Sequence, residues 1–163
     1  LKGSFEENTE INFYDLNGKL VYSKYVSQTP ELIVIDEFDM FPDWMDKYDH
    51  IIELGKELDP LDEAKKIDEN LIKGCQSRVW LSAQLNEKGK VIFTADSDAV
   101  ITKGLVALMI RVFSDVEPME IASADLRFLE VIGLNSHLSP TRSNGLLSMV
   151  KQMKMYGLAF SAR

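Results

Sequence analysis

The sequence is poor in the residues that carry covalent and metal chemistry. It has one cysteine, Cys75, and two histidines, His50 and His137, in 163 residues. One cysteine cannot form an internal disulfide or a cysteine-only metal site. A structural zinc site or an iron–sulfur cluster needs several Cys or His ligands at paired spacing, so the sequence argues against both. Cys75 is therefore a nucleophile, a sulfur carrier or part of the packing.

Long apolar runs and a basic surplus are also missing. No run approaches the about 20 apolar residues that span a bilayer, and residues 1–10 lack the order of a secretory signal. We therefore expect no membrane partner, and a single cysteine favours the reducing cytoplasm. The net charge of −8 argues against a nucleic-acid partner, because phosphates would be repelled. With 45% apolar residues, a chain of this length can bury a core.

Acidic residues are absent after Glu130. Arg142, Lys151, Lys154 and Arg163 follow it, so this last segment carries a charge of +4 and the rest of the chain −12. Two interpretations of this asymmetry stay open. The basic segment lies against acidic neighbours in the same fold, or it forms a docking face for a partner.

The order of the expected elements predicts an α+β fold. Alternating apolar and polar residues predict an N-terminal hairpin across Asn17 and Gly18 and a central hairpin of strands 79–85 and 90–95. Apolar residues at helical spacing predict helices on both sides of this central hairpin. The expected helices cover residues 30–38, 43–58, 97–113, a short segment from 118, 125–133 and a last one from 140. Helices, a small antiparallel sheet and further helices are typical of α+β rather than of alternating parallel units.

Several polar residues lie where helix caps are expected. Thr29, Ser97, Asp125 and Ser139 each precede a predicted helix. The acidic residues that flank Ser97 suggest a cation site, but such a triplet before an apolar helix is typical of capping. We therefore expect structural roles for these side chains.

The cysteine lies at a bend of the chain. Gly74 precedes Cys75, and Gln76, Ser77 and Arg78 follow it, at the end of a polar loop that begins near residue 59. These neighbours bring donors that could stabilise a thiolate or the terminal sulfur of a persulfide. Inert packing remains the alternative, because cysteine is among the most buried residue types.

A cysteine-dependent hydrolase or transferase is the main enzymatic alternative, and it needs a histidine base beside the thiol. His50 lies inside the predicted helix 43–58, where a structural histidine is favoured. His137 lies on a predicted loop before Pro140 and is the better partner for Cys75. A third alternative is an interaction module in which Cys75 only packs.

Four blocks of the sequence resemble the SufE family of sulfur-acceptor proteins in iron–sulfur cluster assembly, which includes the CsdE branch. They are WMDKYDHIIELG at 44–55, LIKGCQSRVW at 71–80, DSDAVITKGL at 96–105 and HLSPTRSNGL at 137–146. The resemblance runs from about residue 38 to the C-terminus and implies a core similar to that of the IscU scaffold. It also implies that Cys75 is the sulfur-accepting cysteine.

The resemblance implies a role as acceptor and activator rather than as an independent enzyme. Cys75 would take sulfane sulfur as a persulfide from a SufS-type cysteine desulfurase, stimulate that desulfurase and deliver the sulfur to a SufBCD-type assembly complex. Pyridoxal phosphate would belong to the desulfurase, so no cofactor and no metal are expected in this chain.

Supporting residues follow from the same blocks. Arg142 matches a family position near the sulfur-transfer surface, where it would dock the partner or favour the thiolate. Asp98 matches a position whose surroundings control exposure of the cysteine loop. Gln76, Ser77 and His137 are weaker candidates. Plain structural roles stay open for Arg142, as the partner of an acidic neighbour, and for Asp98, at a helix start.

The N-terminus departs from the family pattern. We expect a hairpin-like extension over residues 1–27, followed by a sulfur-acceptor domain over residues 28–163. The extension matches nothing in the family, and it would be an extra strand pair, a cover over the cysteine loop or a contact in a homodimer.

Overall fold

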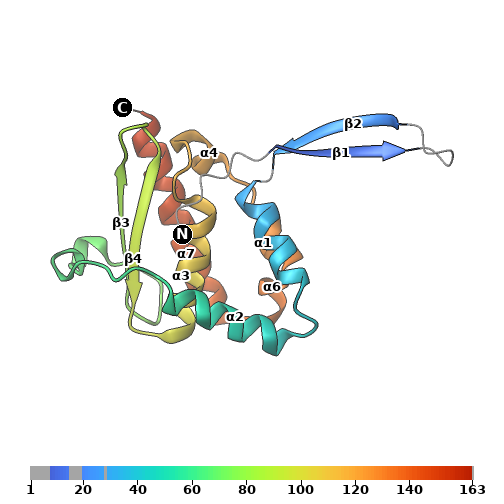
Figure 1. The fold of residues 1–163 in the computed structure, drawn as a ribbon. Helices are drawn as coiled ribbons and strands as arrows, with labels where there is room; N and C mark the ends of the chain where they lie inside the picture. The colour runs from blue at the N-terminus through green and yellow to red at the C-terminus, as the bar shows by residue number, and fades with distance from the viewer. Residues whose placement is uncertain (1–7, 15–19, 28, 163) are drawn as a thin grey trace.

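The computed structural model describes residues 8–14, 20–27 and 29–162. Helices make up most of this part of the chain, and two separate pairs of antiparallel strands accompany them. The predicted α+β class is confirmed. Figure 1 shows the second strand pair standing on one side of the helices, with α3 and α7 behind it.

The N-terminal strand pair consists of β1 (Asn8–Tyr14) and β2 (Leu20–Ser27). Asn8 lies opposite Ser27, and a register shift separates Phe13 from Tyr14. This pairing agrees with the predicted hairpin. Its expected turn at Asn17 and Gly18 lies outside the described residues.

The central hairpin joins β3 (Val79–Leu85) to β4 (Val91–Ser97), with Val79 opposite Ser97. Alternate residues of each strand are buried because one face of the pair packs on helices. The buried set is Val79, Leu81, Val91, Phe93 and Ala95. Helix α3 (Val100–Phe113) follows β4 directly and packs against it. Strand β4 and helix α3 therefore hold fixed positions close to the cysteine loop.

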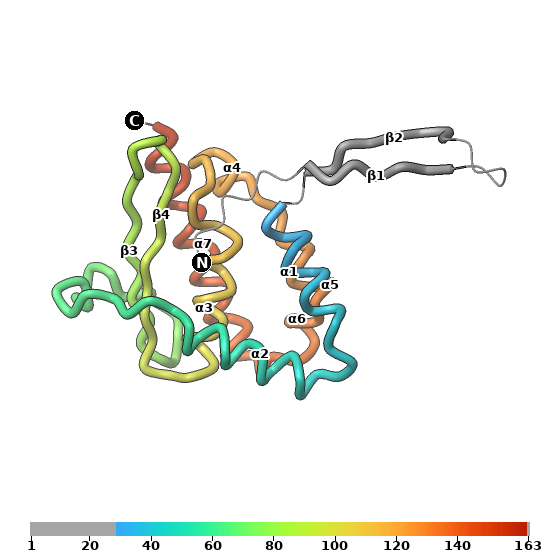
Figure 2. Tube along the Cα trace, in the orientation of Figure 1, coloured from blue at the N-terminus to red at the C-terminus, as the bar shows by residue number. Residues whose placement is uncertain are grey.

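The remaining helices mostly match the predicted segments. They are α1 (Pro30–Asp39), α2 (Trp44–Lys56), α4 (Pro118–Ser123), α5 (Arg127–Val131), α6 (Leu134–His137) and α7 (Pro140–Ser161). Helix α1 packs on α5, at a distance from the central hairpin (Figure 2). None of the helices in the described residues carries a long enough apolar stretch to cross a bilayer.

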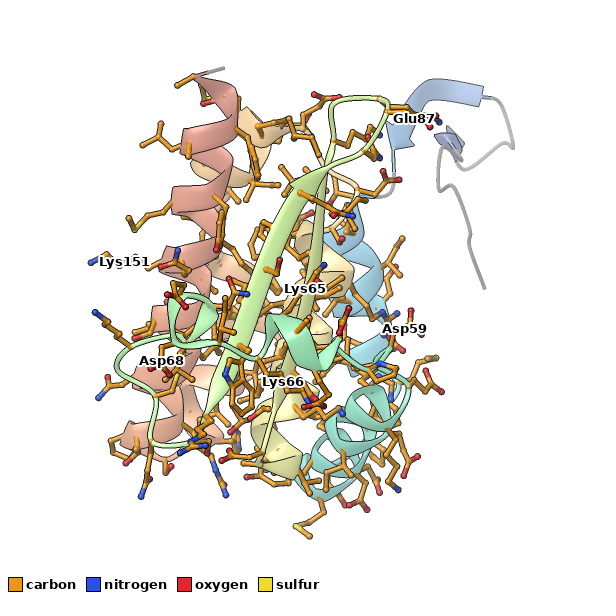
Figure 3. The ribbon with its side chains drawn as sticks, turned by 90° about the vertical axis from the view of Figure 1, so that its left-hand side faces the viewer. Asp59, Lys65, Lys66, Asp68, Glu87 and Lys151 are labelled. Atoms are coloured by element: carbon orange, nitrogen blue, oxygen red, sulfur yellow. The ribbon has the colours of Figure 1, made fainter. Side chains whose placement is uncertain are left out.

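The segment between α2 and β3 is not purely loop. It contains two short 3₁₀ helices, η1 (Glu63–Lys65) and η2 (Asp68–Asn70). Figure 3 shows Lys65, Lys66 and Asp68 on this segment, where it passes in front of the central hairpin. The segment thus joins the outer side of the sheet to the cysteine loop.

Two of the four predicted caps are confirmed and two are wrong. Thr29 and Ser139 accept hydrogen bonds from the backbone N–H groups three residues on. Ser97 instead ends β4, because the strand continues two residues further than predicted, and Ala99 begins α3 without a side-chain cap. Asp125 lies two residues before Arg127, the first residue of α5, and accepts from the N–H of Arg127 at 2.9 Å, while Leu126 holds the N-cap position.

Glycines set the closest helix contacts. A Cβ atom on Gly104 of α3 would lie 2.1 Å from the carbonyl oxygen of Ile51 on α2, and one on Gly55 would lie 2.8 Å from the Gly104 nitrogen. Any larger residue at this crossing would separate the two helix backbones. Helices α2 and α3, which both reach the site described below, are therefore held at a fixed distance.

Candidate functional site

The cysteine loop is closed at its base by backbone pairing. The N–H of Ile72 donates to the carbonyl oxygen of Val79 at 2.8 Å, and an isolated bridge joins Leu71 to Trp80. Ile72 and Val79 are both buried and anchor this base in the core. Residues 73–78 therefore project from a fixed base as a compact loop, with Cys75 near the middle.

Gly74 is required by the shape of this loop. Its φ of +92° lies in the left-handed region, which residues with a Cβ atom rarely adopt. A Cβ atom there would also lie 3.0 Å from the hydroxyl oxygen of Ser148 on α7. The glycine thus lets the chain turn tightly against α7 just before the cysteine.

Cys75 lies half-buried in a cleft of about 290 Å³. Its thiol donates to the carbonyl oxygen of Gly145 on α7 at a sulfur–oxygen distance of 3.6 Å. The cysteine loop, the first turn of α3 and the first turns of α7 form the walls. Besides Cys75, the polar lining residues are Gln76, Ser77, Thr102, Thr141 and Arg142, and Gly145 makes the closest contact with the sulfur atom. The cleft can hold a small group attached to the sulfur atom.

Burial raises the pKa of the Cys75 thiol above its ordinary value. The thiol is therefore the favoured form in the closed loop at neutral pH. Because the thiolate is the nucleophile, reaction is favoured when the loop opens and water or a partner's donors reach the sulfur.

Arg142 is an exposed residue on the first turn of α7, and it lines the cleft. Its guanidinium donates to the hydroxyl of Tyr48 on α2 and lies 5.9 Å from the centre of the Tyr48 ring. An aromatic ring attracts a cation placed over its face. The partner of Arg142 is thus a tyrosine, not the acidic neighbour considered above. Tyr48 was not singled out from the sequence, although it stands in the block at residues 44–55.

Gln76 and Ser77 lie with Cys75 on the wall of the cleft. The Ser77 hydroxyl accepts from the hydroxyl of Thr102 at 3.5 Å, which links the loop weakly to α3. Gln76 is exposed. Its amide is free to meet an incoming group.

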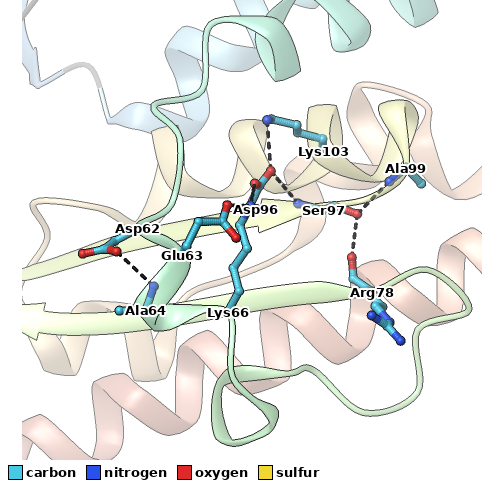
Figure 4. Close-up of polar contacts among 9 residues, drawn as sticks. All are labelled: Asp62, Glu63, Ala64, Lys66, Arg78, Asp96, Ser97, Ala99 and Lys103. Carbon is cyan, nitrogen blue, oxygen red and sulfur yellow. Dashed lines mark hydrogen bonds and ion pairs between the residues drawn. The ribbon is translucent and has the colours of Figure 1, made fainter.

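Asp98 ties the end of the cysteine loop to the junction of β4 and α3. Its carboxylate accepts from the N–H of Arg78 at 2.9 Å, and its own N–H donates to the carbonyl oxygen of Arg78 at 3.3 Å. The Ser97 hydroxyl donates to the same carbonyl oxygen at 2.9 Å (Figure 4). Asp98 is not among the residues lining the cleft, and its contact with the cysteine loop is the Arg78 backbone.

The structure does not bring a histidine to Cys75. His137 is the last residue of α6 rather than part of a loop, and its Nδ1 lies 2.8 Å from the carbonyl oxygen of Gly133. Its ring stacks on Trp44 with centroids 4.1 Å apart. His50 lies 3.0 Å from a carboxylate oxygen of Glu37. Neither histidine lines the cysteine cleft.

Asp96 forms a charged cluster behind the cleft instead of a helix cap. Its two carboxylate oxygens each lie 2.9 Å from an ammonium nitrogen, one of Lys66 and one of Lys103 (Figure 4). Burial raises the pKa of Asp96, but hydrogen bonds from Lys103 and Lys66 outweigh burial and hold it below its usual range. Across the described residues, no group of three or more His, Cys, Asp or Glu side chains is arranged to hold a metal ion.

Comparison with known protein families identifies the family to which this chain belongs. The SufE domain model, described as an Fe-S metabolism associated domain, matches residues 33–157. The chain belongs to the SufE family. The match covers the SufE core with Cys75, Asp98 and Arg142, and it begins after the N-terminal strand pair. Membership assigns this chain to iron–sulfur metabolism.

A solved structure shares the fold of this SufE chain. It is the solution structure of a hypothetical protein from Thermus thermophilus, which matches with a TM-score of 0.70 and 15% sequence identity. The match covers 82% of this chain and 97% of the other. At that identity the likeness supports the fold alone.

Proposed function

We propose that this SufE-family chain relays sulfur through Cys75. A SufS-type cysteine desulfurase donates sulfane sulfur to Cys75. This transfer removes the persulfide from the desulfurase and thereby stimulates its turnover. Cys75 persulfide then delivers the sulfur to a SufBCD-type assembly complex. Pyridoxal phosphate stays with the desulfurase. The observation that carries the proposal is a half-buried thiol in a cleft, on a loop that has a fixed base.

The transfer is a thiol–disulfide type exchange. The Cys75 thiol loses its proton to solvent, and the thiolate attacks the outer sulfur of the desulfurase persulfide. A new sulfur–sulfur bond forms on Cys75, the old one breaks, and the desulfurase cysteine leaves as a thiolate. No external oxidant or reductant is needed, because one persulfide replaces another.

The cleft suits both halves of a relay. A persulfide is reactive and has to be kept from stray thiols, and a cleft of about 290 Å³ has room for one more sulfur atom beside the Cys75 thiol. Transfer requires the same sulfur to reach another protein. The loop contacts at 3.6 Å to Gly145 and 3.5 Å from Thr102 are weak enough to break on docking.

Arg142 and Asp98 support different steps. Arg142 lines the cleft and is exposed, so it would attract an acidic partner surface and would favour the thiolate once the loop opens. Asp98 holds the Arg78 backbone and thereby limits how far the loop opens. Tyr48 positions the Arg142 guanidinium by its hydroxyl and its ring.

Mass spectrometry tests the relay directly. The full chain is incubated with a SufS-type desulfurase and cysteine and then digested without reductant. The mass of the peptide that contains Cys75 is measured. We expect one added sulfur atom on Cys75 and none in Cys75→Ser. Faster cysteine turnover by the desulfurase is expected with the parent chain and not with the variant.

Two results would contradict the proposal. One is an unmodified Cys75 while the desulfurase turns over at full rate, and the other is equal sulfur delivery by Cys75→Ser. Hydrolysis of a small thioester or amide by the isolated chain would favour the cysteine-dependent enzyme instead. A variant such as His137→Ala, which leaves the cleft lining intact, would then distinguish a histidine-assisted reaction.

A further inference from the structure

A second concave surface lies on α7, away from Cys75. It is a groove of about 330 Å³ between α7 and the segment that joins α4 to α5. The side chains that line it are mostly apolar, and two lysines stand among them. They are Ala122, Leu126, Leu147, Val150, Lys151, Lys154, Met155 and Leu158.

Three of the apolar side chains that line this groove are open to solvent. Leu147 is 52% exposed, Met155 54% and Leu158 60%. They recur at spacings of eight and three residues, which places them on one side of a helix with 3.6 residues per turn. Contiguous exposed apolar surface of this kind marks an interaction site rather than scattered surface residues.

The groove and the cysteine cleft use opposite sides of α7. Gly145 and Met149 line the cleft, whereas Leu147 and Val150 line the groove. With about 100° of rotation per residue, positions 145 and 149 share one side and position 147 faces away from it. A partner in the groove would leave the cleft accessible.

Charge decides what kind of partner fits. Lys151 and Lys154 line the groove, and no acidic side chain does. The Lys154 ammonium donates to the carbonyl oxygen of Ala124. Hydrogen bonds from Arg127 lower the pKa of the nearby Asp125 carboxyl, and the Lys154 charge lowers it further. Lys151 points outward (Figure 3) and also borders a neighbouring cleft that Asp68 and Glu69 line. These lysines belong to the segment of charge +4 in a chain of net charge −8. A basic, apolar face on an acidic protein is complementary to an acidic, apolar segment.

We propose that the groove is the docking site for an acidic amphipathic helix of a partner protein, bound while Cys75 remains accessible on the other side of α7. Apolar side chains at helical spacing would fill the space between Leu126, Leu147 and Leu158. Carboxylates beside them would face Lys151, which lies at the boundary with a neighbouring cleft. This is the helix-in-groove mode of recognition.

Two other occupants fit the charges less well. A symmetric second copy would bring the same patch together and set Lys151 and Lys154 against their own counterparts. An anionic bilayer would attract the two lysines but repel a chain of net charge −8. Both are outcomes that the experiment separates.

The probe is a fluorescein-labelled peptide of about 14 residues with leucines at i, i+3 or i+4, and i+7 and glutamates beside them. A matched peptide carries lysine at every glutamate position. Fluorescence anisotropy with the full chain is expected to show about tenfold tighter binding of the acidic peptide. Lys151→Glu is expected to remove most of that preference, and Leu158→Gln to weaken both peptides about fivefold.

Met45→Gln is the matched control. Met45 is 69% exposed on α2 and lies outside the groove, so its replacement should leave peptide binding unchanged. Alkylation of Cys75 should proceed at the same rate with and without bound peptide. Neither measurement involves sulfur transfer. The docking proposal can therefore be contradicted without contradicting the proposed sulfur relay, and the relay can be contradicted without contradicting the docking site.

Three results would overturn the proposal. The first is equal binding of the acidic and basic peptides, or none. The second is a dimer by sedimentation equilibrium that Leu158→Gln converts to monomer, which would assign the groove to a second copy. The third is binding to phosphatidylglycerol vesicles that Leu158→Gln abolishes, without peptide preference, which would assign it to a membrane.

Discussion

The two halves of the connection between α2 and β3 are held by different forces. In the first half, Lys66 lies 2.6 Å from a carboxylate oxygen of Glu63, 2.9 Å from one of Asp96 and 5.9 Å from the Trp80 ring centre. In the second half, the side chains of Cys75 and Ser77 make contacts of 3.6 Å and 3.5 Å. Charge-assisted hydrogen bonds are shorter and stronger than neutral ones, so the first half is held more firmly than the second.

The proposed relay needs the first half to stay in place and the second half to move, and this difference in contacts fits that requirement. The charged cluster fastens the first half to β4 and α3, so the base at Ile72 and Val79 keeps its place. In the proposed relay, Cys75 would leave the cleft while this base stays in place. Asp98 links the two halves, because its carboxylate accepts from Arg78 at the end of the cysteine loop while Asp98 itself lies at the junction of β4 and α3.

The largest expected effect is on the fixed half. Asp96→Asn removes the charge that two ammonium groups share, and the free energy of unfolding should fall by about 2 kcal/mol near pH 7. Urea unfolding followed by circular dichroism measures this. Glu63→Gln is the matched control: it removes only an exposed pair with Lys66 and should cost less than about 1 kcal/mol.

The difference in stability between the parent chain and Asp96→Asn should depend on pH. The pKa of Asp96 is lower in the folded chain than in the unfolded chain, so its contribution is present above the unfolded value. It is lost as the pH falls through the folded pKa. The stability difference between parent and Asp96→Asn should therefore shrink in acid, and an unchanged difference would contradict the ion-pair explanation.

The next effect is on the moving half. Asp98→Ala releases the Arg78 N–H and should raise the rate of Cys75 alkylation by iodoacetamide about fivefold, equivalent to about 1 kcal/mol of loop opening. Asp62→Ala is the control, because Asp62 accepts from the Ala64 N–H on the fixed half. A control that reacts as fast as Asp98→Ala would remove the distinction between the two halves.

The pH profile of alkylation sharpens the comparison further. Burial raises the pKa of Cys75 in the closed loop, so the rate should rise at higher pH than for a free cysteine derivative. Ionisation favours the open loop, since the closed one disfavours the thiolate. In Asp98→Ala the profile should move towards that of the free derivative. An identical profile in both proteins would mean that loop opening does not control ionisation.

The smallest expected effect concerns Tyr48. Tyr48→Phe keeps the ring under Arg142 but removes the hydroxyl that the guanidinium donates to. Sulfur acceptance from the desulfurase should slow about twofold, with stability unchanged within about 0.5 kcal/mol. Tyr156→Phe, at a ring 6.2 Å from that of Phe93, is the control and should transfer at the parent rate.

Local patterns predicted the elements well because strand and helix periodicities are local properties. The strand Val79–Leu85 and the starts of the helices at Pro30, Pro118 and Pro140 are as expected. The error at Ser97 has a physical reason. The carboxylate of Asp96 is held by two lysines from outside the strand, so pairing with β3 continues through residues that otherwise favour a cap.

The site depended on contacts between distant segments, which local patterns do not contain. The sequence placed Cys75, Gln76 and Ser77 together, and the resemblance added Arg142. The contact of Cys75 with Gly145 joins residues 70 positions apart, and that of Tyr48 with Arg142 joins residues 94 apart. Asp98 was expected either to control exposure of the cysteine loop or to have a structural role at a helix start. It lies directly before Ala99, the N-cap of α3, and bonds to the Arg78 backbone, so its control of the loop stays a prediction.

The glycine crossing of α2 and α3 limits how this protein can be engineered. A helix-favouring substitution such as Gly104→Ala gains about 1 kcal/mol in an isolated helix and is a common route to thermostable variants. Here the added methyl group would collide with the Ile51 carbonyl and drive apart the supports of Tyr48 and Thr102. The cost of this collision exceeds the gain in helix propensity, so Gly104→Ala would destabilise the protein and shift the two helices that carry Tyr48 and Thr102.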